Sequence, residues 1–285
     1  MQSVPDWIDF WRDLVDLNDR WLEKDETQED HWRKSARKFA EAVRKRWQKP
    51  DSIRDFFLAR VSEKKGASLL DVGAGTGAWS ILAAKCGLRV TAVDPSAAML
   101  EVMREEMAAE GIVEGEDGIQ IVHGCWPEVA AQVEPHDLTL CAHAIYGVRE
   151  ISPFIDQLNE KTLKTCFMLV IAPEMDALMA EFARRVLGHP FDSPDFPVLY
   201  NLLIQKGIYA NVLFSNEGLW DGWTSKSLED ALQDVKQRLG LKQNPEYDDY
   251  IYSRLKEELA FDGENYVWPR GIRTAMVYWD RPAAN

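Results

Sequence analysis

Apolar and polar residues follow two different rhythms along the chain, and the rhythm changes near residue 66. Before that point, apolar side chains recur every three or four positions, which is typical of amphipathic helices. The helices expected there start at Pro5 with Ser3 as cap, at about Thr27, and at Asp51 or Ser52. We therefore expect residues 1–65 to form a helical N-terminal appendage or lid.

From residue 68, short apolar runs alternate with amphipathic helical patterns. The strand candidates are Ser68–Val72, Arg89–Val93, Ile119–His123, Leu138–Ala142, Cys166–Ile171, Ala210–Ser215 and Arg273–Trp279. The helical patterns cover 78–85, 96–109, 152–163, 177–187, 198–206, 227–239 and 247–259. Strands separated by helices imply an α/β fold with a mostly parallel sheet covered on both faces. Residues 66–285 are expected to form this domain, with lid insertions around 174–200 and 216–262.

The net charge of the chain restricts the classes of molecule that it can bind. The 285 residues carry a formal net charge of −14, and the excess of acidic residues lies beyond residue 65. An acidic body repels phosphate backbones, so nucleic acid is an unfavourable partner. The segment Arg33–Lys49 is the exception, with eight basic residues against Glu41. It is either a solvated helix face or a site that attracts an acidic substrate or partner.

Other sequence features exclude several classes of protein. The longest run without a charged residue has 13 residues, short of the ~18 that suggest a membrane span. The amino terminus lacks the layout of a secretory signal. The four cysteines form no C-x-x-C pair and no histidine stands at metal spacing, so we expect no disulfide framework and no metal site. We expect a soluble, cytoplasmic protein.

The most informative segment is 68–78, which reads Ser-Leu-Leu-Asp-Val-Gly-Ala-Gly-Thr-Gly-Ala. Gly73, Gly75 and Gly77 allow a sharp turn between strand and helix and let a ligand approach the backbone. The next strand ends in Asp94, whose carboxylate can accept hydrogen bonds from both hydroxyls of a ribose. These features predict a nucleoside site at the carboxyl ends of the strands. The glycine spacing alone also fits the dinucleotide pattern.

The sequence Asp-Val-Gly-Ala-Gly-Thr-Gly, followed by Val-Asp-Pro-Ser at 93–96, closely resembles the first two motifs of Rossmann-like S-adenosylmethionine-dependent methyltransferases. The resemblance covers Ser52–Pro173 well. It implies a doubly wound, mostly parallel seven-stranded sheet with an antiparallel last strand. It also implies that S-adenosyl-L-methionine is the cofactor and S-adenosylhomocysteine the product. A nicotinamide enzyme and a module that only senses the cofactor are the alternatives from other classes.

The resemblance further implies roles for individual residues. Asp71 would order the glycine loop or reach the methionine amino group. Gly73, Gly75 and Gly77 would line the methionine and ribose portions of the cofactor, while Asp94 would hold the ribose hydroxyls.

The adenine end of the predicted site departs from the family pattern. Pro95 and Met99 would offer apolar surface to the adenine. The family often has Gly-Asp after the third strand, whereas this chain reads His-Gly-Cys-Trp-Pro from residue 123. Cys125 could supply its backbone N–H, and Trp126 or Glu128 could replace the missing contact. Trp126 is alternatively a core or lid aromatic.

The end of the fourth strand, 140–146, lies where this family places methionine-side and substrate-side residues. Ala142 would border the cofactor, and His143 and Tyr146 are the catalytic candidates. A histidine that changes charge near neutral pH suits removal of a proton from an acceptor hydroxyl or amine. Alternatively, His143 forms a hydrogen bond with the backbone beside the cofactor and takes no part in catalysis.

Absent motifs and the flanking segments favour a small-molecule acceptor. The Asn/Asp-Pro-Pro-Tyr/Phe segment of base-amino methyltransferases is missing after the fourth strand, and no paired-glutamate loop of protein-arginine enzymes occurs. Tryptophan-rich helices before the domain and a long segment after the fifth strand suggest a lid over the acceptor. The candidates for this lid or pocket are Trp7, Trp11, Trp32, Phe191 and Tyr200. A same-fold enzyme acting on protein or nucleic acid is the alternative, and whether oxygen, nitrogen or carbon is methylated stays open.

Overall fold

A computed structural model describes residues 6–19, 30–175, 177–217, 223–269 and 271–281. The predicted cap Ser3 and the predicted helix start at Thr27 lie outside these residues. Among the described ranges, no helix combines the length and the apolar character that crossing a membrane requires.

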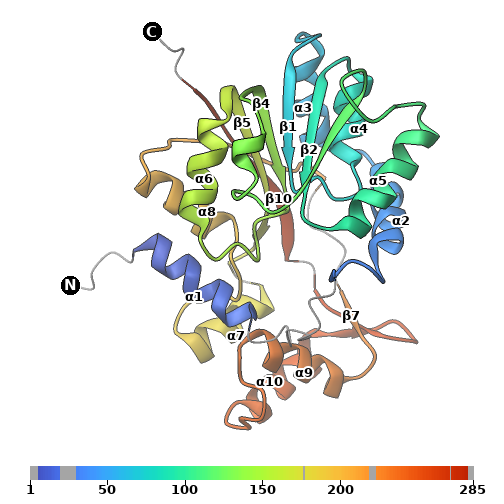
Figure 1. Cartoon of the computed structure of the whole chain (residues 1–285). Helices are drawn as coiled ribbons and strands as arrows, with labels where there is room; N and C mark the ends of the chain where they lie inside the picture. The colour runs from blue at the N-terminus through green and yellow to red at the C-terminus, as the bar shows by residue number, and fades with distance from the viewer. Residues whose placement is uncertain (1–5, 20–29, 176, 218–222, 270, 282–285) are drawn as a thin grey trace.

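A seven-stranded sheet forms the centre of the molecule, in the order β3-β2-β1-β4-β5-β10-β6 (Figure 1). The strands are β1 Ser68–Val72, β2 Arg89–Asp94, β3 Ile119–His123, β4 His136–Ala142, β5 Thr162–Pro173, β6 Asn211–Phe214 and β10 Ile272–Asp280. Strands β1 to β5 pair in parallel, whereas β10 lies antiparallel between β5 and β6. The predicted fold class, a mostly parallel sheet with an antiparallel last strand, is confirmed.

Helices cover both faces of this sheet, as expected for a doubly wound fold (Figure 1). One face packs against α3 Ser52–Ser62, α4 Ala78–Lys85 and α5 Ala97–Ala109. The opposite face packs against α1 Trp7–Asp19, α6 Ile151–Glu160 and α8 Phe196–Gln205, with the 3₁₀ turn Ala130–Gln132 beside them. The buried apolar side chains of these helices and strands form the two halves of the core.

A third apolar cluster lies away from the central sheet. It joins α7 Leu178–Leu187, α9 Leu228–Arg238 and α10 Asp248–Glu258. A small antiparallel sheet of β7 Thr224–Ser225, β9 Tyr266–Val267 and β8 Ala260–Phe261 accompanies these helices. This small sheet was not predicted from the sequence.

Two helices that precede the sheet, α1 and α3, start at capping carboxylates. Asp6 accepts hydrogen bonds from the backbone N–H groups of Ile8 and Asp9 at the start of α1. Asp51 caps α3 in the same way, as expected. Trp11 of α1 is fully buried, and its indole N–H donates to the carbonyl of Val148 at 2.8 Å.

The second helix, α2 Ala36–Trp47, is shorter than predicted because residues 31–35 form turns. Asp30 anchors this segment. Its carboxylate accepts hydrogen bonds from the N–H of Trp32, the hydroxyl of Ser96 and the N–H of Ala98. These bonds tie the segment before α2 to the start of α5. The position of α2 beside α5 follows from this tie (Figure 1).

Candidate functional site

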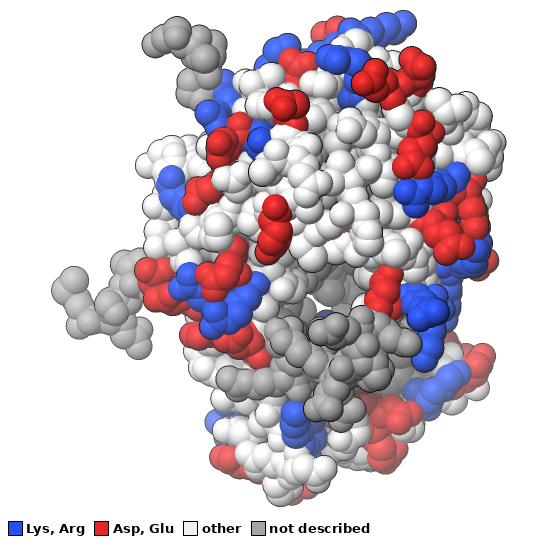
Figure 2. Space-filling model, viewed as in Figure 1, with Lys and Arg blue, Asp and Glu red and all other residues white. Residues whose placement is uncertain are grey.

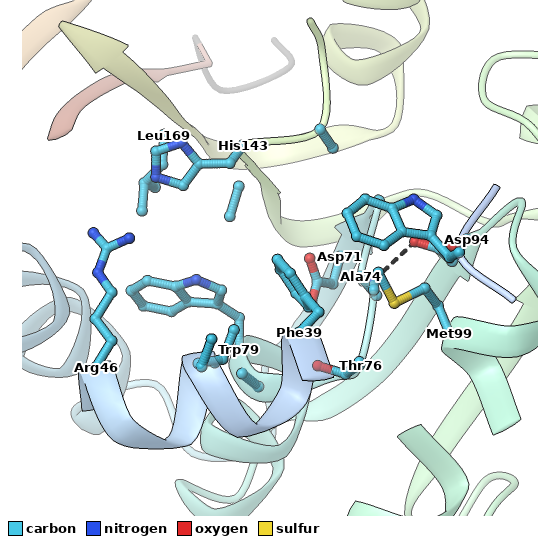
Figure 3. Close-up of a pocket in the computed structure, with 18 of the residues that line it drawn as sticks. Phe39, Arg46, Asp71, Ala74, Thr76, Trp79, Asp94, Met99, His143 and Leu169 are labelled. Carbon is cyan, nitrogen blue, oxygen red and sulfur yellow. Dashed lines mark hydrogen bonds between the residues drawn. The ribbon is translucent and has the colours of Figure 1, made fainter. Parts of the chain in front are cut away.

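A cavity of about 780 Å³ lies at the carboxyl ends of β1, β2, β4 and β5, where α2 forms one of its walls (Figure 3). Nine of the residues predicted from the sequence line it: Asp71, Gly73, Gly75, Asp94, Pro95, Met99, Ala142, His143 and Tyr146. The remaining predicted residues, Gly77, Cys125 and Trp126, are not among those that line it.

The glycine turn after β1 forms the floor of one end of the cavity. Gly73 adopts a positive φ of 73°, and its N–H donates to the carbonyl of Val93 at 2.8 Å. A Cβ atom at Gly73 would lie 2.2 Å from that of Ala144, so only glycine fits there. Gly75 has a φ of 56°, and a Cβ atom there would meet nothing within 4 Å. Gly75 therefore leaves open space for a ligand, whereas Gly77 packs against Met103.

Asp94 joins the glycine turn to the start of α5. Its carboxylate accepts hydrogen bonds from the N–H groups of Gly75 at 2.8 Å and Ser96 at 2.9 Å, and Figure 3 shows the former as a dashed line. Burial raises the pKa of this carboxyl group above its usual value, although the two N–H donors act in the opposite direction. The acceptor for ribose hydroxyls that the sequence predicts is thus held rigidly at the edge of the cavity.

Asp71 is a buried carboxyl group with one unsatisfied oxygen. Its Oδ2 atom accepts a hydrogen bond from the Ser80 hydroxyl at 2.6 Å. Its Oδ1 atom is buried and has no hydrogen-bond partner among the described residues. Burial, with a smaller contribution from the charge of Asp94, raises the pKa of Asp71 to about 7. A buried acceptor without a donor is costly, and a cationic donor in the cavity would relieve that cost.

Trp32 and Met99 close the end of the cavity near Asp94. Met99 is buried against Trp32 and the α2 residues Ala36 and Ala40. The indole of Trp32 also meets Phe39 edge to face, with ring centroids 5.2 Å apart. This end of the cavity is therefore apolar and suits a flat heterocycle. Of the predicted lid residues, Trp32 lines the cavity.

The other aromatic candidates occupy core positions. Trp126 is buried, and its indole N–H donates to the Phe154 carbonyl of α6 at 3.2 Å. Cys125 is exposed beside it. Four lid candidates pack in or against the core cluster on the α6 face of the sheet: Trp7, Trp11, Phe191 and Tyr200.

His143 and Tyr146 lie side by side beyond β4. His143 has a positive φ of 57°, and its N–H donates to the Leu169 carbonyl at 2.8 Å. Its Nδ1 atom lies 2.7 Å from the Tyr146 hydroxyl, which in turn accepts a hydrogen bond from the N–H of Ile171. Tyr146 thus links the imidazole to the backbone of β5.

The imidazole of His143 is neutral at physiological pH. Burial, together with the nearby positive charge of Arg46, lowers the pKa of His143 to about 3. Burial also raises the pKa of Tyr146 above its usual range. The expectation of a charge change near neutral pH is therefore wrong for this histidine, because burial and the charge of Arg46 both disfavour the protonated imidazole.

Several lining residues were missed by sequence reasoning: Phe39, Arg46 and Trp47 of α2, and Trp79 of α4. Trp47 and Trp79 meet edge to face with ring centroids 5.2 Å apart. The available signals were the basic run that contains Arg46 and the position of Trp79 directly after the glycine motif. Within the described ranges, no cluster of three or more His, Cys, Asp or Glu residues is arranged to hold a metal ion.

Residues 69–162 match a family model described as a methyltransferase domain. An uncharacterized protein of Haemophilus influenzae is 26% identical over 214 residues, which are 73% of this chain and 74% of that protein. A shorter segment of 68 residues, 24% of this chain, is 44% identical to 11% of a probable protein arginine N-methyltransferase 3 of Oryza sativa. Among solved structures, the magnesium protoporphyrin IX methyltransferase of Synechocystis with bound SAH is similar, with a TM-score of 0.48 and 13% identity over 97% of this chain and 100% of that one.

Proposed function

We propose that the chain, whose residues 69–162 match a methyltransferase domain, is an S-adenosylmethionine-dependent methyltransferase that methylates a small-molecule acceptor in the cavity beside α2. The observation that carries this proposal is the continuity of one cavity from the glycine turn to an aromatic region. Polar groups suited to the cofactor and apolar groups suited to an acceptor border the same space. The proposed product besides the methylated acceptor is S-adenosylhomocysteine.

The cofactor end of the cavity fits S-adenosylmethionine. The unsatisfied Oδ1 atom of Asp71 would accept a hydrogen bond from the ammonium group of the methionine portion. Asp94 would accept hydrogen bonds from the ribose hydroxyls. The open space at Gly75 would let the ribose and methionine portions of the cofactor lie close to the backbone. Pro95 and Met99, with Trp32, would border the adenine. Cys125 and Trp126 do not line the cavity, so we assign neither of them to the adenine.

The chemistry requires alignment more than acid–base assistance. When bound, S-adenosylmethionine would supply a methyl group that its sulfonium activates toward a lone pair of the acceptor. The protein contributes by holding the acceptor in line and by excluding water. A histidine with a pKa near 3 is a weak base at neutral pH, so we assign His143 to hydrogen bonding of the acceptor.

Tyr146 would set the orientation of that hydrogen bond. Its hydroxyl accepts from the N–H of Ile171, which leaves its proton to be donated to the Nδ1 atom of His143. The imidazole proton then resides on Nε2, and His143 can donate it to an acceptor oxygen. In this role His143 and Tyr146 position the acceptor and need not exchange protons with it.

The surface supports a small acceptor over a polyanion. Acidic and basic side chains are interspersed on the face shown in Figure 2, and the described residues form no extended basic area there. On α2, Arg37 and Arg44 pair with Glu105 and Glu106 of α5, which reduces the charge that a polymer would meet. A nucleic-acid substrate would instead need basic side chains gathered over a continuous area and not neutralised by neighbouring carboxylates.

Titration calorimetry with S-adenosylhomocysteine and, separately, NADH tests the proposed cofactor. Binding of the former and not of the latter is expected, and the reverse result would refute the assignment. Release of S-adenosylhomocysteine from S-adenosylmethionine in a screen of small acceptors then tests catalysis. The variant Lys38→Glu/Lys45→Glu, which changes exposed positions of α2, should retain this activity. Cofactor binding without product formation in any screen would favour a sensing module.

A further inference from the structure

Asp30 connects the chain segment before α2 with the start of α5. One carboxylate oxygen accepts a hydrogen bond from the N–H of Trp32 at 3.0 Å, and the other accepts one from the N–H of Ala98 at 2.9 Å. The hydroxyl of Ser96 lies 2.9 and 2.8 Å from these two oxygens. Burial acts to raise the pKa of Asp30, but these donors hold it below its usual value, so the carboxylate is charged at neutral pH. Each oxygen therefore holds a different segment of the chain.

Ser96 joins this carboxylate to the proposed ribose acceptor. Its N–H donates to one oxygen of Asp94 at 2.9 Å, while its hydroxyl is bonded to Asp30. The other oxygen of Asp94 accepts a hydrogen bond from the N–H of Gly75. A continuous series of hydrogen bonds thus runs from Trp32 through Asp30 and Ser96 to the glycine turn. This series fixes the place of Trp32 relative to the ribose acceptor.

Trp32 borders the adenine end of the cavity and is only half-buried. Its indole packs beside Met99, and Figure 3 shows Met99 and Asp94 together at this end of the cavity. The rings of Phe39 and His31 meet the indole edge to face, with centroids 5.2 and 5.4 Å away. The indole is therefore supported by its neighbours and keeps surface that a purine can cover.

The loop after β3 makes no such wall. In the part of the chain that the structure describes, no residue from 119–135 lines the cavity. The imidazole of His123 lies 3.0 Å from the carbonyl of Pro95, and the indole of Trp126 is bonded to the carbonyl of Phe154. An aromatic wall for the adenine therefore comes from the segment that Asp30 anchors.

We infer, resting on the proposed function, that Asp30 is a positioning residue for the adenine of the cofactor. It holds Trp32 at a fixed place beside the ribose acceptor Asp94, and the indole lies against the purine. Asp30 acts through Trp32 and not by touching the ligand. Its effect on affinity arises because a side chain that is already in place need not be ordered when the ligand binds.

An electrostatic effect of Asp30 on the ribose acceptor would have the opposite sign. Burial raises the pKa of Asp94, and the charge of Asp30 raises it further. The variant Asp30→Asn removes this charge, which favours the ionised form of Asp94 and so favours ribose binding. Weaker cofactor binding in this variant therefore reports on Trp32.

A double-mutant cycle tests the inference, with S-adenosylhomocysteine affinity measured by calorimetry. Asp30→Asn keeps the size of the side chain but has one acceptor oxygen, so it cannot accept from both Trp32 and Ala98. Trp32→Ala should weaken binding about tenfold, the order expected for stacking of a base on an aromatic ring. Asp30→Asn should weaken it about fivefold and the double variant about tenfold in total, whereas independent effects would multiply to about fiftyfold.

Two controls accompany the cycle. Arg37→Gln removes an ion pair with Glu105 that joins the same two helices, and it should bind S-adenosylhomocysteine as the unchanged protein does. Oxidative footprinting of the unchanged protein does not depend on the folding of any variant. The ligand should protect Trp32 from oxidation, whereas Tyr209, which is 80% exposed and does not line the cavity, should react equally with and without it.

Four results would overturn the inference if S-adenosylhomocysteine binds the unchanged protein. They are full affinity in Asp30→Asn, independent losses in the double variant, an equal loss in Arg37→Gln, and no protection of Trp32. Each of them leaves the proposed function intact. Failure of S-adenosylhomocysteine to bind the unchanged protein would instead refute the proposed function, so the two failures are distinguishable.

Discussion

The unsatisfied oxygen of Asp71 leads to a prediction about the pH dependence of cofactor binding. Burial raises the pKa of this carboxyl group to about 7 in the ligand-free protein. Below that pH the group is protonated and neutral, and it offers no charge to the ammonium group of S-adenosylhomocysteine. Above that pH it is ionised. Affinity should therefore rise as the pH increases from 6 to 8.

The magnitude follows from the fraction of Asp71 that is ionised. With a pKa of about 7, roughly one molecule in eleven is ionised at pH 6 and about ten in eleven at pH 8. If the ligand binds only the ionised form, its dissociation constant falls about tenfold, or about 1.4 kcal/mol. His143 does not titrate in this interval because its pKa is about 3. Burial also raises the pKa of Asp94, so a variant is needed to separate the two carboxyl groups.

Calorimetry at pH 6, 7 and 8 provides the measurement, with two controls. Asp71→Asn retains an oxygen for the Ser80 hydroxyl but cannot ionise, so its affinity should be low and nearly independent of pH. The second control is 5′-methylthioadenosine, which keeps the nucleoside and lacks the amino acid portion. Its binding should not depend on the ionisation of Asp71. A constant affinity for S-adenosylhomocysteine across this range, or an unchanged pH dependence in Asp71→Asn, would refute the assignment.

Further predictions concern the turn, the ribose site and α1. Asp94→Asn should weaken S-adenosylhomocysteine binding by roughly 2–4 kcal/mol in calorimetry, because a charged acceptor of the ribose hydroxyls is lost; an unchanged dissociation constant would contradict this. Gly75→Ala should fold and lose affinity, since its Cβ enters open ligand space, although the φ of 56° costs an alanine some stability; Gly73→Ala should lower the melting temperature further, because its Cβ also meets Ala144. Equal thermal stability of the two glycine variants would argue against the described turn. Trp11→Ala should destabilise the protein by about 3–5 kcal/mol in denaturant unfolding, since this side chain is fully buried, and a smaller loss would mean that α1 is not part of the core.

Strand positions near the glycine motif were predictable because their signals are local. The bounds of β1 and β3 match the apolar runs that predict them. The start of β5 was missed by four residues, and the preceding helix was extended to Leu163. Thr162 and Thr165 are buried and bonded to Thr139 and Asp280, respectively, so their polar character concealed the strand. Strands of two residues, such as β7, are too short to show an alternating pattern.

The candidate site also has a part that could be predicted from the sequence and a part that could not. Residues of the glycine turn and Asp94 were identified because the motif that they form is continuous in sequence. The other end of the cavity was not identified, because Arg46 and Thr274 meet only through the packing of α2 near β10. The aromatic candidates show a further limit of sequence patterns. Apolar spacing alone does not separate Trp11, which packs in the core, from Trp32, which lines the cavity.

The division of the cavity between chain segments has a consequence for changing the enzyme. Most of the groups proposed to bind the cofactor lie within Asp71–Met99, with Trp32 and Ala142 outside it, whereas α2 contributes several side chains to the rest of the cavity. Phe39 packs against Trp32, but Val43 and Trp47 of α2 do not contact the groups proposed to bind the nucleoside. Libraries that vary Val43 and Trp47 together are therefore a direct route to variants that accept new compounds and still bind the cofactor.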